Sequence, residues 1–138
     1  MDTVSQSVGL RRVADGQVDQ ELLRATLAYD RSEPYEVRVL FPPGLEQMNL
    51  VLSRELVAGG LNHPVTFGGI GVWPSLDDRW AVCIGWSTPE GHTWFEALAT
   101  TVAHFLDMTY RLVPWGSESP RADIDNVIAA ILNGGGAR

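Results

Sequence analysis

The sequence predicts a single α+β domain in which the strands come first and the helices come last. A chain of 138 residues is long enough to bury one core. Over most of the first hundred positions, apolar and polar residues alternate, as in strands with one buried face. From Thr100 onwards, apolar residues instead recur every three or four positions. Because strands and helices do not alternate regularly, the sheet should be mostly antiparallel.

About seven strands are expected, and several of them end at a proline or a glycine. In the clearest case Tyr35, Val37, Val39 and Phe41 share one face. A later strand should stop at Pro74, because proline lacks the N–H group that a further ladder bond needs. The expected strands are 9–13, 21–29, 35–41, 47–53, 69–73, 80–87 and 93–98.

Three helices are expected, one short helix in the middle of the chain and two near its C-terminus. The short one should begin at Arg54, after Ser53 as its N-cap, and stop at Gly59-Gly60. The longest should fall within residues 100–113 and end before Pro114. A second C-terminal helix is expected over 124–132, followed by a flexible tail at 133–138.

The composition argues against nucleic-acid and membrane binding. The net charge is −7, the isoelectric point is about 4.8, and the ten basic residues are all arginines. Such a surface repels phosphate backbones and anionic lipids. The N-terminus lacks a secretion signal, and no stretch approaches the length of a membrane span. We therefore expect a soluble cytoplasmic protein that does not insert into the membrane.

No catalytic, cofactor or metal site is expected from the titratable residues. His63, His92 and His104 are scattered and lack the spacing of metal ligands. Cys83 is the only cysteine, and its apolar neighbours indicate a buried position instead of a nucleophile. Asp77-Asp78 reads as a turn. We expect neither an enzyme nor a cofactor.

Two glycine-containing runs resemble known motifs only in part. Residues 68–71 lack the Lys-Ser/Thr ending of a phosphate loop, and they lead into a strand. Residues 85–87 contain Gly-x-Ser without the closing glycine of a nucleophile elbow. The first run is therefore interpreted as a loop or a bulge, and the second is not interpreted as a nucleophile elbow.

The five tryptophans are expected in the core or at protein interfaces. Trp94 is followed by Phe95 on one strand, so one of the two must face away from the core. Aromatic residues on both sides of a small sheet indicate that its outer side is covered, either by the terminal helices or by another subunit. The tryptophans are residues 73, 80, 86, 94 and 115.

Several short segments stand in a characteristic order and at a characteristic spacing. They are Tyr29-Asp30, Pro34-Tyr35 with Val37, Leu56, Gly60-Leu61 with Pro64, Val72-Trp73-Pro74-Ser75, Val82-Cys83-Ile84, Ser87 with Pro89-Glu90-Gly91, Phe105-Leu106 with Thr109, and Val113-Pro114 with Gly116 and Glu118. Together these segments resemble the SsgA-like family of actinomycetes, nearest to its SsgB branch. The similarity covers about two-thirds of the chain, and residues 1–20 match poorly. The whole chain, 1–138, is interpreted as one SsgA-like domain.

The resemblance implies a fold, an assembly and a function. The fold would be Whirly-like, with two antiparallel sheets and packed helices, and the assembly would be a homotrimer. The function would be a non-enzymatic role in sporulation-linked cell division, in which the protein is recruited to the septum. Its partners would be the tubulin-like division GTPase FtsZ and a second SsgA-like protein. Because Whirly-like folds elsewhere bind single-stranded nucleic acid, that activity is the alternative.

Partner contacts are expected on two loops, 63–69 and 76–79, because loops on a rigid scaffold often carry recognition. That these loops only connect strands is an equally open interpretation. The candidate partner-binding residues are His63, Phe67, Leu76, Asp78 and Arg79.

Overall fold

Within residues 2–14, 17–89 and 91–118, which the computed structural model describes, eight strands form one antiparallel sheet. Their order across the sheet is β4-β3-β2-β1-β8-β7-β6-β5. The two halves of the sheet meet where the end of β1 pairs with β8, for example Arg11 with Glu96. The strands are β1 (Thr3–Ala14), β2 (Gln17–Asp30), β3 (Glu36–Leu40), β4 (Leu50–Ser53), β5 (Val65–Phe67), β6 (Ile70–Pro74), β7 (Ala81–Thr88) and β8 (Gly91–Leu98).

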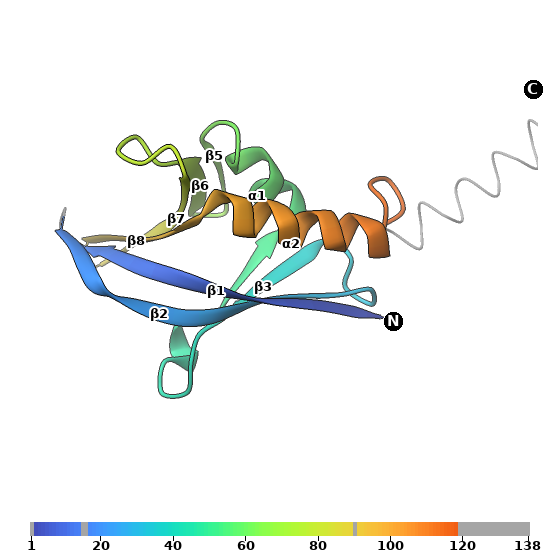
Figure 1. Cartoon of the computed structure of the whole chain (residues 1–138), viewed down its shortest axis with the longest axis horizontal. Coiled ribbons are helices and arrows are strands. Elements are labelled where there is room, and N and C mark those ends of the chain that lie inside the picture. Colours follow the sequence, from blue (N-terminus) through green and yellow to red (C-terminus); the bar gives the residue numbers. More distant parts are fainter. Residues whose placement is uncertain (1, 15–16, 90, 119–138) are drawn as a thin grey trace, which may run out of the picture.

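Two helices, α1 (Arg54–Gly60) and α2 (Ala99–Leu112), pack on one face of the curled sheet (Figure 1). Alternate residues of each strand face them, as the pleat requires. The core joins both helices to all the longer strands. It contains Val8, Leu10, Ala25, Leu27, Tyr29, Val37, Val39, Phe41, Leu52, Leu56, Val57, Val72, Val82, Ile84, Phe95, Ala97, Val102, Phe105, Leu106 and Val113.

Several local predictions are confirmed. The Ser53 hydroxyl accepts a hydrogen bond from the Leu56 N–H at 3.1 Å, so Ser53 caps α1 as expected. The longest helix among the described residues is α2, which begins one residue before the predicted range and ends one residue before its end. β6 ends at Pro74. Phe95 is buried, and Trp94 faces away from the core.

The expectation of a mostly antiparallel fold is confirmed, but the expectation of two sheets is wrong, because the described chain forms one sheet. That sheet has eight strands, one more than the seven that were expected. The strand that was missed is β5, whose three residues are too few to show a period of two. The single sheet depends on the pairing of β1 with β8. These two strands are about eighty residues apart in the sequence, so no local pattern predicts that they pair.

Smaller differences have local causes. The predicted strand 47–53 begins only at Leu50, because Glu46–Met48 forms a 3₁₀ turn. Tyr35 precedes β3 and is 54% exposed, although its parity matches the buried residues of that strand. The expected helix at 124–132 and the tail at 133–138 lie outside the described residues.

The outer face of the sheet is not covered by α1 or α2, because both helices lie on the other face. The expectation that the helix of residues 100–113 covers the outer face is therefore wrong. Coverage of this face by another subunit stays a prediction. In the part of the chain that the structure describes, neither helix has the length and apolarity to cross a membrane.

Candidate functional site

The first predicted partner-binding loop, residues 63–69, follows α1 and contains β5. His63 is exposed in the turn after the helix, and Phe67 is 77% exposed at the end of β5. Gly68 and Gly69 turn the chain into β6 with φ angles of 63° and 82°. Glycine adopts such positive φ angles much more readily than other residues, so Gly68 and Gly69 can form this turn.

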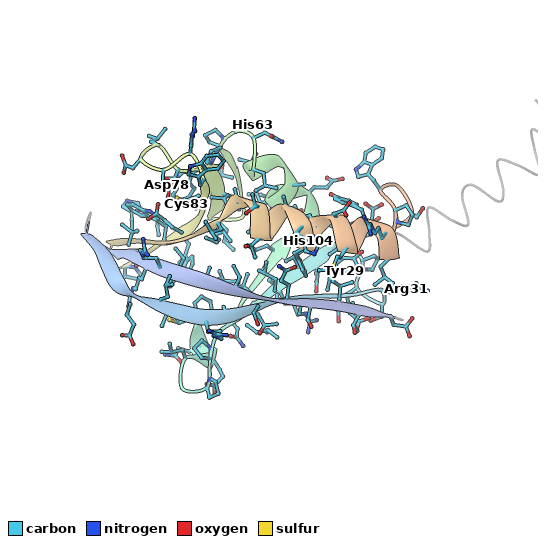
Figure 2. The ribbon with its side chains drawn as sticks, viewed as in Figure 1. Tyr29, Arg31, His63, Asp78, Cys83 and His104 are labelled. Atoms are coloured by element: carbon cyan, nitrogen blue, oxygen red, sulfur yellow. The ribbon has the colours of Figure 1, made fainter. Side chains whose placement is uncertain are left out.

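The second predicted loop, residues 76–79, joins β6 to β7. Leu76 is 99% exposed. The Asp78 carboxylate accepts a hydrogen bond from the Trp80 N–H at 2.9 Å, and the Arg79 guanidinium lies over the Trp80 ring at 4.6 Å from its centroid. Figure 2 shows Asp78 and His63 on separate segments. The structure does not gather the five predicted residues into one site, because Phe67 and Asp78 line different hollows.

The hollow beside Phe67 is an open groove of roughly 560 Å³ on the outer side of the sheet. We call it the tryptophan groove. Two of its rings, Trp73 on β6 and Trp94 on β8, meet edge to face with centroids 6.1 Å apart and planes inclined by 61°. Such an arrangement is favourable for aromatic rings. The groove is lined by residues 66–71, Trp73, 85–87 and 92–94.

The tryptophan groove exists because two cross-strand neighbours are glycines. Gly71 pairs with Gly85, so the sheet carries no side chain at either position. A Cβ atom on Gly85 would lie 2.6 Å from the Trp94 Cβ and 2.7 Å from the Trp73 Cη2. The tryptophans therefore lie closely over bare backbone, which only glycine permits.

The side chains that line the tryptophan groove are aromatic or neutral and polar. The Ser87 hydroxyl and the His92 Nδ1 are hydrogen-bonded at 2.8 Å. Aspartate, glutamate and arginine are absent from the residues that line it. The groove thus offers ring faces and hydrogen-bonding groups, and no carboxylate, ammonium or guanidinium group lines it.

A second hollow of roughly 380 Å³ lies further along the same sheet face. Leu22 and Leu98 line it and are 57% and 58% exposed. Asp78 and Glu96 contribute carboxylates, and Glu96 accepts a hydrogen bond from the Ser75 hydroxyl at 3.2 Å. An apolar surface with a few charges is typical of a protein contact.

Inside the molecule, Arg54 at the start of α1 is only 1% exposed. Its guanidinium donates to the carbonyls of Thr109 at 3.2 Å and Val113 at 2.8 Å, and lies 3.1 Å from the Glu118 carboxylate. Tyr110 stacks on it at 4.2 Å. This cluster joins α1 to the end of α2, so its role is structural.

The titratable groups do not form a catalytic constellation in the described chain. Burial, with the nearby charge of Glu96, raises the pKa of the Cys83 thiol to about 12. A thiol with so high a pKa is a poor nucleophile at neutral pH. Among the described residues, no three or more His, Cys, Asp or Glu side chains come together as metal ligands would.

Residues 23–118, from β2 to the end of the described chain, match the sequence pattern of the family described as Streptomyces sporulation and cell division protein, SsgA. The chain belongs to the SsgA family. The family region includes the tryptophan groove, both predicted loops and the Arg54 cluster. The family is one of sporulation and cell-division proteins and is not a known enzyme family.

Similar proteins carry the name sporulation-specific cell division protein SsgB. The one from Streptomyces coelicolor is 37% identical over 132 residues, which are 94% of this chain and 96% of that protein. The one from Frankia casuarinae is 32% identical over 139 residues, covering 99% of this chain and 96% of its own. These SsgA-family relatives are therefore similar along nearly their entire length.

Two solved structures share the fold. An SsgA-like sporulation-specific cell division protein from Thermobifida fusca is 33% identical, with a TM-score of 0.77 over 92% of this chain and 93% of its own. A structure of Streptomyces coelicolor SsgB, whose mutations correlate to longitudinal cell division during sporulation, is 38% identical. It has a TM-score of 0.72 over 84% of this chain and 92% of its own.

Sequence reasoning placed Phe67 on a recognition loop but did not connect it with Trp73, Gly85 and Trp94. The glycine at position 85 could have indicated this site, because a glycine inside a strand pattern often marks a close approach of another group. The pairing of Gly71 with Gly85 could not be predicted from the sequence, since it depends on the register of β6 against β7.

Proposed function

We propose that this protein is a non-enzymatic scaffold of sporulation-linked cell division. It is recruited from the cytoplasm to the nascent septum and helps to position it by binding FtsZ-type division machinery together with another SsgA-like protein. The observation that carries the proposal is similarity to SsgB proteins at 32–37% identity over nearly the whole chain. The chemistry of the described residues offers no competing catalytic role.

Recognition is assigned to the loop residues His63, Phe67, Leu76, Asp78 and Arg79. All five are exposed, and Phe67 and Leu76 are large apolar side chains held out in solvent. Exposed large apolar side chains bury apolar surface when a partner covers them, so they suit protein contacts.

The proposal also includes a Whirly-like homotrimer. Leu22 and Leu98 both line the second hollow, on the sheet face that α1 and α2 leave open. Closed cyclic assembly is a common way to bury such a face. Binding of single-stranded nucleic acid is less well supported, because no arginine lines the tryptophan groove and phosphates need cationic partners.

The proposal is tested by imaging a fluorescent copy with labelled FtsZ in a sporulating actinomycete whose own copy is deleted. We expect foci at septal positions before the septa close, and loss of the foci when Phe67→Ser and Leu76→Ser are combined. Tyr35→Ser, which changes an exposed aromatic residue just before β3, serves as the matched control. Diffuse fluorescence throughout septation, with normal septa in the deletion strain, would contradict the proposed function.

A further inference from the structure

We propose that the unpaired side of Thr3–Leu10 on β1, which we call the β1 edge, binds an extended segment of a partner protein as an added strand. The segment alternates apolar and polar side chains and carries an acidic residue that meets Arg111. The inference rests on the proposed function, because it specifies how a division scaffold would hold another protein.

The β1 edge lacks a neighbouring strand over most of its length. β2 pairs with β1 from Thr3 to Ala14, whereas β8 pairs only with Arg11–Ala14. Among the described residues, no strand pairs with Thr3–Leu10 on the side away from β2. Along a strand, successive residues direct their N–H and C=O groups to opposite sides, so about half of these residues present both groups at the open side. Another extended chain matches such a row of donors and acceptors.

The β1 edge also lacks the features that protect edge strands. The two outer strands of the sheet are short, with four residues in β4 and three in β5. Short edges, prolines and charged side chains discourage strand addition. Thr3–Leu10 has none of these, since it is longer and contains no proline and no charged residue. The side-chain oxygen of Gln6 is buried without a hydrogen-bond partner. The outward-facing residues are small and exposed, namely Thr3, Ser5, Ser7 and Gly9.

The start of the β1 edge opens into a hollow of roughly 510 Å³, which is closed on its other side by the last turns of α2. Arg111 is the only charged residue among those that line it. Its ion pair with Asp107, at 3.0 Å, is exposed to solvent and therefore weak. The hollow thus suits apolar side chains next to a carboxylate. The apolar residues that line it are Val4, Met108 and Leu112.

The position of α2 favours a single extended segment over a second folded copy of this chain. α2 starts directly after β8 and runs along β1 (Figure 1). A copy that paired its own β1 here would bring its own α2 to the same side of the joined sheet. Neighbouring strands lie about 4.8 Å apart, whereas packed helices need about 8–10 Å. The two helices would therefore compete for one space, and an extended segment avoids this conflict.

The test uses the intact protein and a capped, fluorescein-labelled peptide, in which valine and threonine alternate between two terminal glutamates. We expect saturable binding in fluorescence polarisation, together with slower amide hydrogen exchange in residues 3–10. N-methylation of every second backbone nitrogen removes hydrogen-bond donors and keeps all side chains. One of the two alternating sets of methylated nitrogens should weaken binding at least about tenfold, and the other should have little effect.

The charge at the hollow is tested by reversing it. Arg111→Glu should weaken binding of the glutamate-ended peptide about fivefold and should favour a peptide with terminal lysines instead. Arg24→Glu is the matched control, because Arg24 is an exposed arginine on β2 that does not line the hollow. Its affinity for both peptides should equal that of the native protein.

Four outcomes would overturn the inference. The first is no saturation while circular dichroism shows a folded protein, and the second is equal binding of both N-methylated peptides. The third is protection of β4 or β5 in place of residues 3–10. The fourth is protection of residues 3–10 that rises with protein concentration without peptide, which would assign the β1 edge to another copy. Septal imaging is scored separately, so retained foci without peptide binding would reject the β1 edge and leave the scaffold role intact.

Discussion

At the scale of single residues, Gly85 and Cys83 show how the outer side of the sheet acquires its properties. The two residues lie two positions apart on β7 and face the same side. Gly85 leaves room for the tryptophan pair, whereas Cys83 is buried and lies near the Glu96 carboxylate. Around these two residues the face therefore presents tryptophan rings, and its thiol is buried.

Gly85→Ala should destabilise the protein by about 1–3 kcal/mol, as expected when a methyl group is forced into packed surroundings. The new Cβ atom would meet Trp94 at 2.6 Å and Trp73 at 2.7 Å. Gly9→Ala is the control on β1, where the nearest atoms, on Leu22, lie at 3.7 Å. Urea denaturation would measure the free energy of unfolding of both variants. Equal stability of the two would contradict the close approach at Gly85.

Cys83 should resist alkylation in the folded protein. Its raised pKa of about 12 leaves almost no thiolate at pH 8, and the thiol is 2% exposed. Iodoacetamide should therefore modify it slowly without denaturant and at the rate of a free thiol in urea, as mass spectrometry would show. Because the chain has no other cysteine, the signal belongs to Cys83 alone. Fast labelling of the folded protein would refute its burial.

At the scale of elements, contacts at both of its ends decide where α1 lies. Ser53 caps its first turn, and Arg54 connects it to α2 through the carbonyls of Thr109 and Val113. Gly60 packs against Val72, where a Cβ atom would lie 2.2 Å from the valine Cγ1. A helix of seven residues is too short to be stable alone, so these contacts maintain it.

Ser53→Ala should cost about 1 kcal/mol, because the Leu56 N–H loses its hydrogen-bond acceptor. Ser53→Asp should retain most of the stability, since aspartate also caps helices well. Thermal and urea denaturation of the two variants provide the comparison. If alanine and aspartate were equally destabilising, capping would not be the role of Ser53.

Glu118→Gln should cost about 3 kcal/mol at neutral pH, because it leaves the buried Arg54 guanidinium without its counter-charge. Arg38→Gln is the control, since its ion pair with Glu33 is exposed to solvent and should contribute little to stability. Denaturant unfolding at pH 7 would separate the two. A similar small loss in both variants would contradict the importance of the buried pair.

The contribution of Glu118 should also depend on pH. Burial raises the pKa of this carboxyl, but hydrogen bonds from its own backbone N–H, Arg54 and Gly116 outweigh burial and hold the pKa below the ordinary 4.5. A depressed folded-state pKa means that the stabilisation is complete above pH 4.5 and is lost as the pH falls through the lower value. The difference in unfolding free energy between the native protein and Glu118→Gln should shrink accordingly. A constant difference down to pH 2 would argue against this linkage.

At the scale of the whole molecule, the sheet divides the protein into a covered face and an open face. Both α1 and α2 pack on one side, where the core lies. On the other side, the large apolar residues Leu22, Val51 and Leu98 are each more than half exposed. This asymmetry supports a role in which the open face meets other protein subunits.

Leu22→Ser combined with Leu98→Ser should therefore weaken self-association. We expect the native protein to sediment as a trimer of 15.1 kDa chains, and the double variant to shift towards monomers at micromolar concentration. Trp115→Ser, which changes an exposed aromatic residue in the segment after α2, should leave the assembly unchanged. A native protein that sediments as a monomer would disprove the trimer.

Local patterns in the sequence determined the features that depend on neighbouring residues. The alternation of Val37, Val39 and Phe41, the Ser53 cap and the extent of α2 were all predictable, because each follows from spacing within a few residues. The same is true of the opposite orientations of Trp94 and Phe95 on β8. The resemblance to the SsgA family also rests on such short segments in order.

Only the tertiary structure decided what depends on pairing between distant segments. The three residues of β5 become a strand because they pair with β6, and β1 joins the two halves of the sheet through β8. The tryptophan groove needs Gly71 opposite Gly85, and the buried Arg54 needs Glu118 more than sixty positions away. Strand register and burial are set by the packing of the whole chain, so no local period in the sequence encodes them.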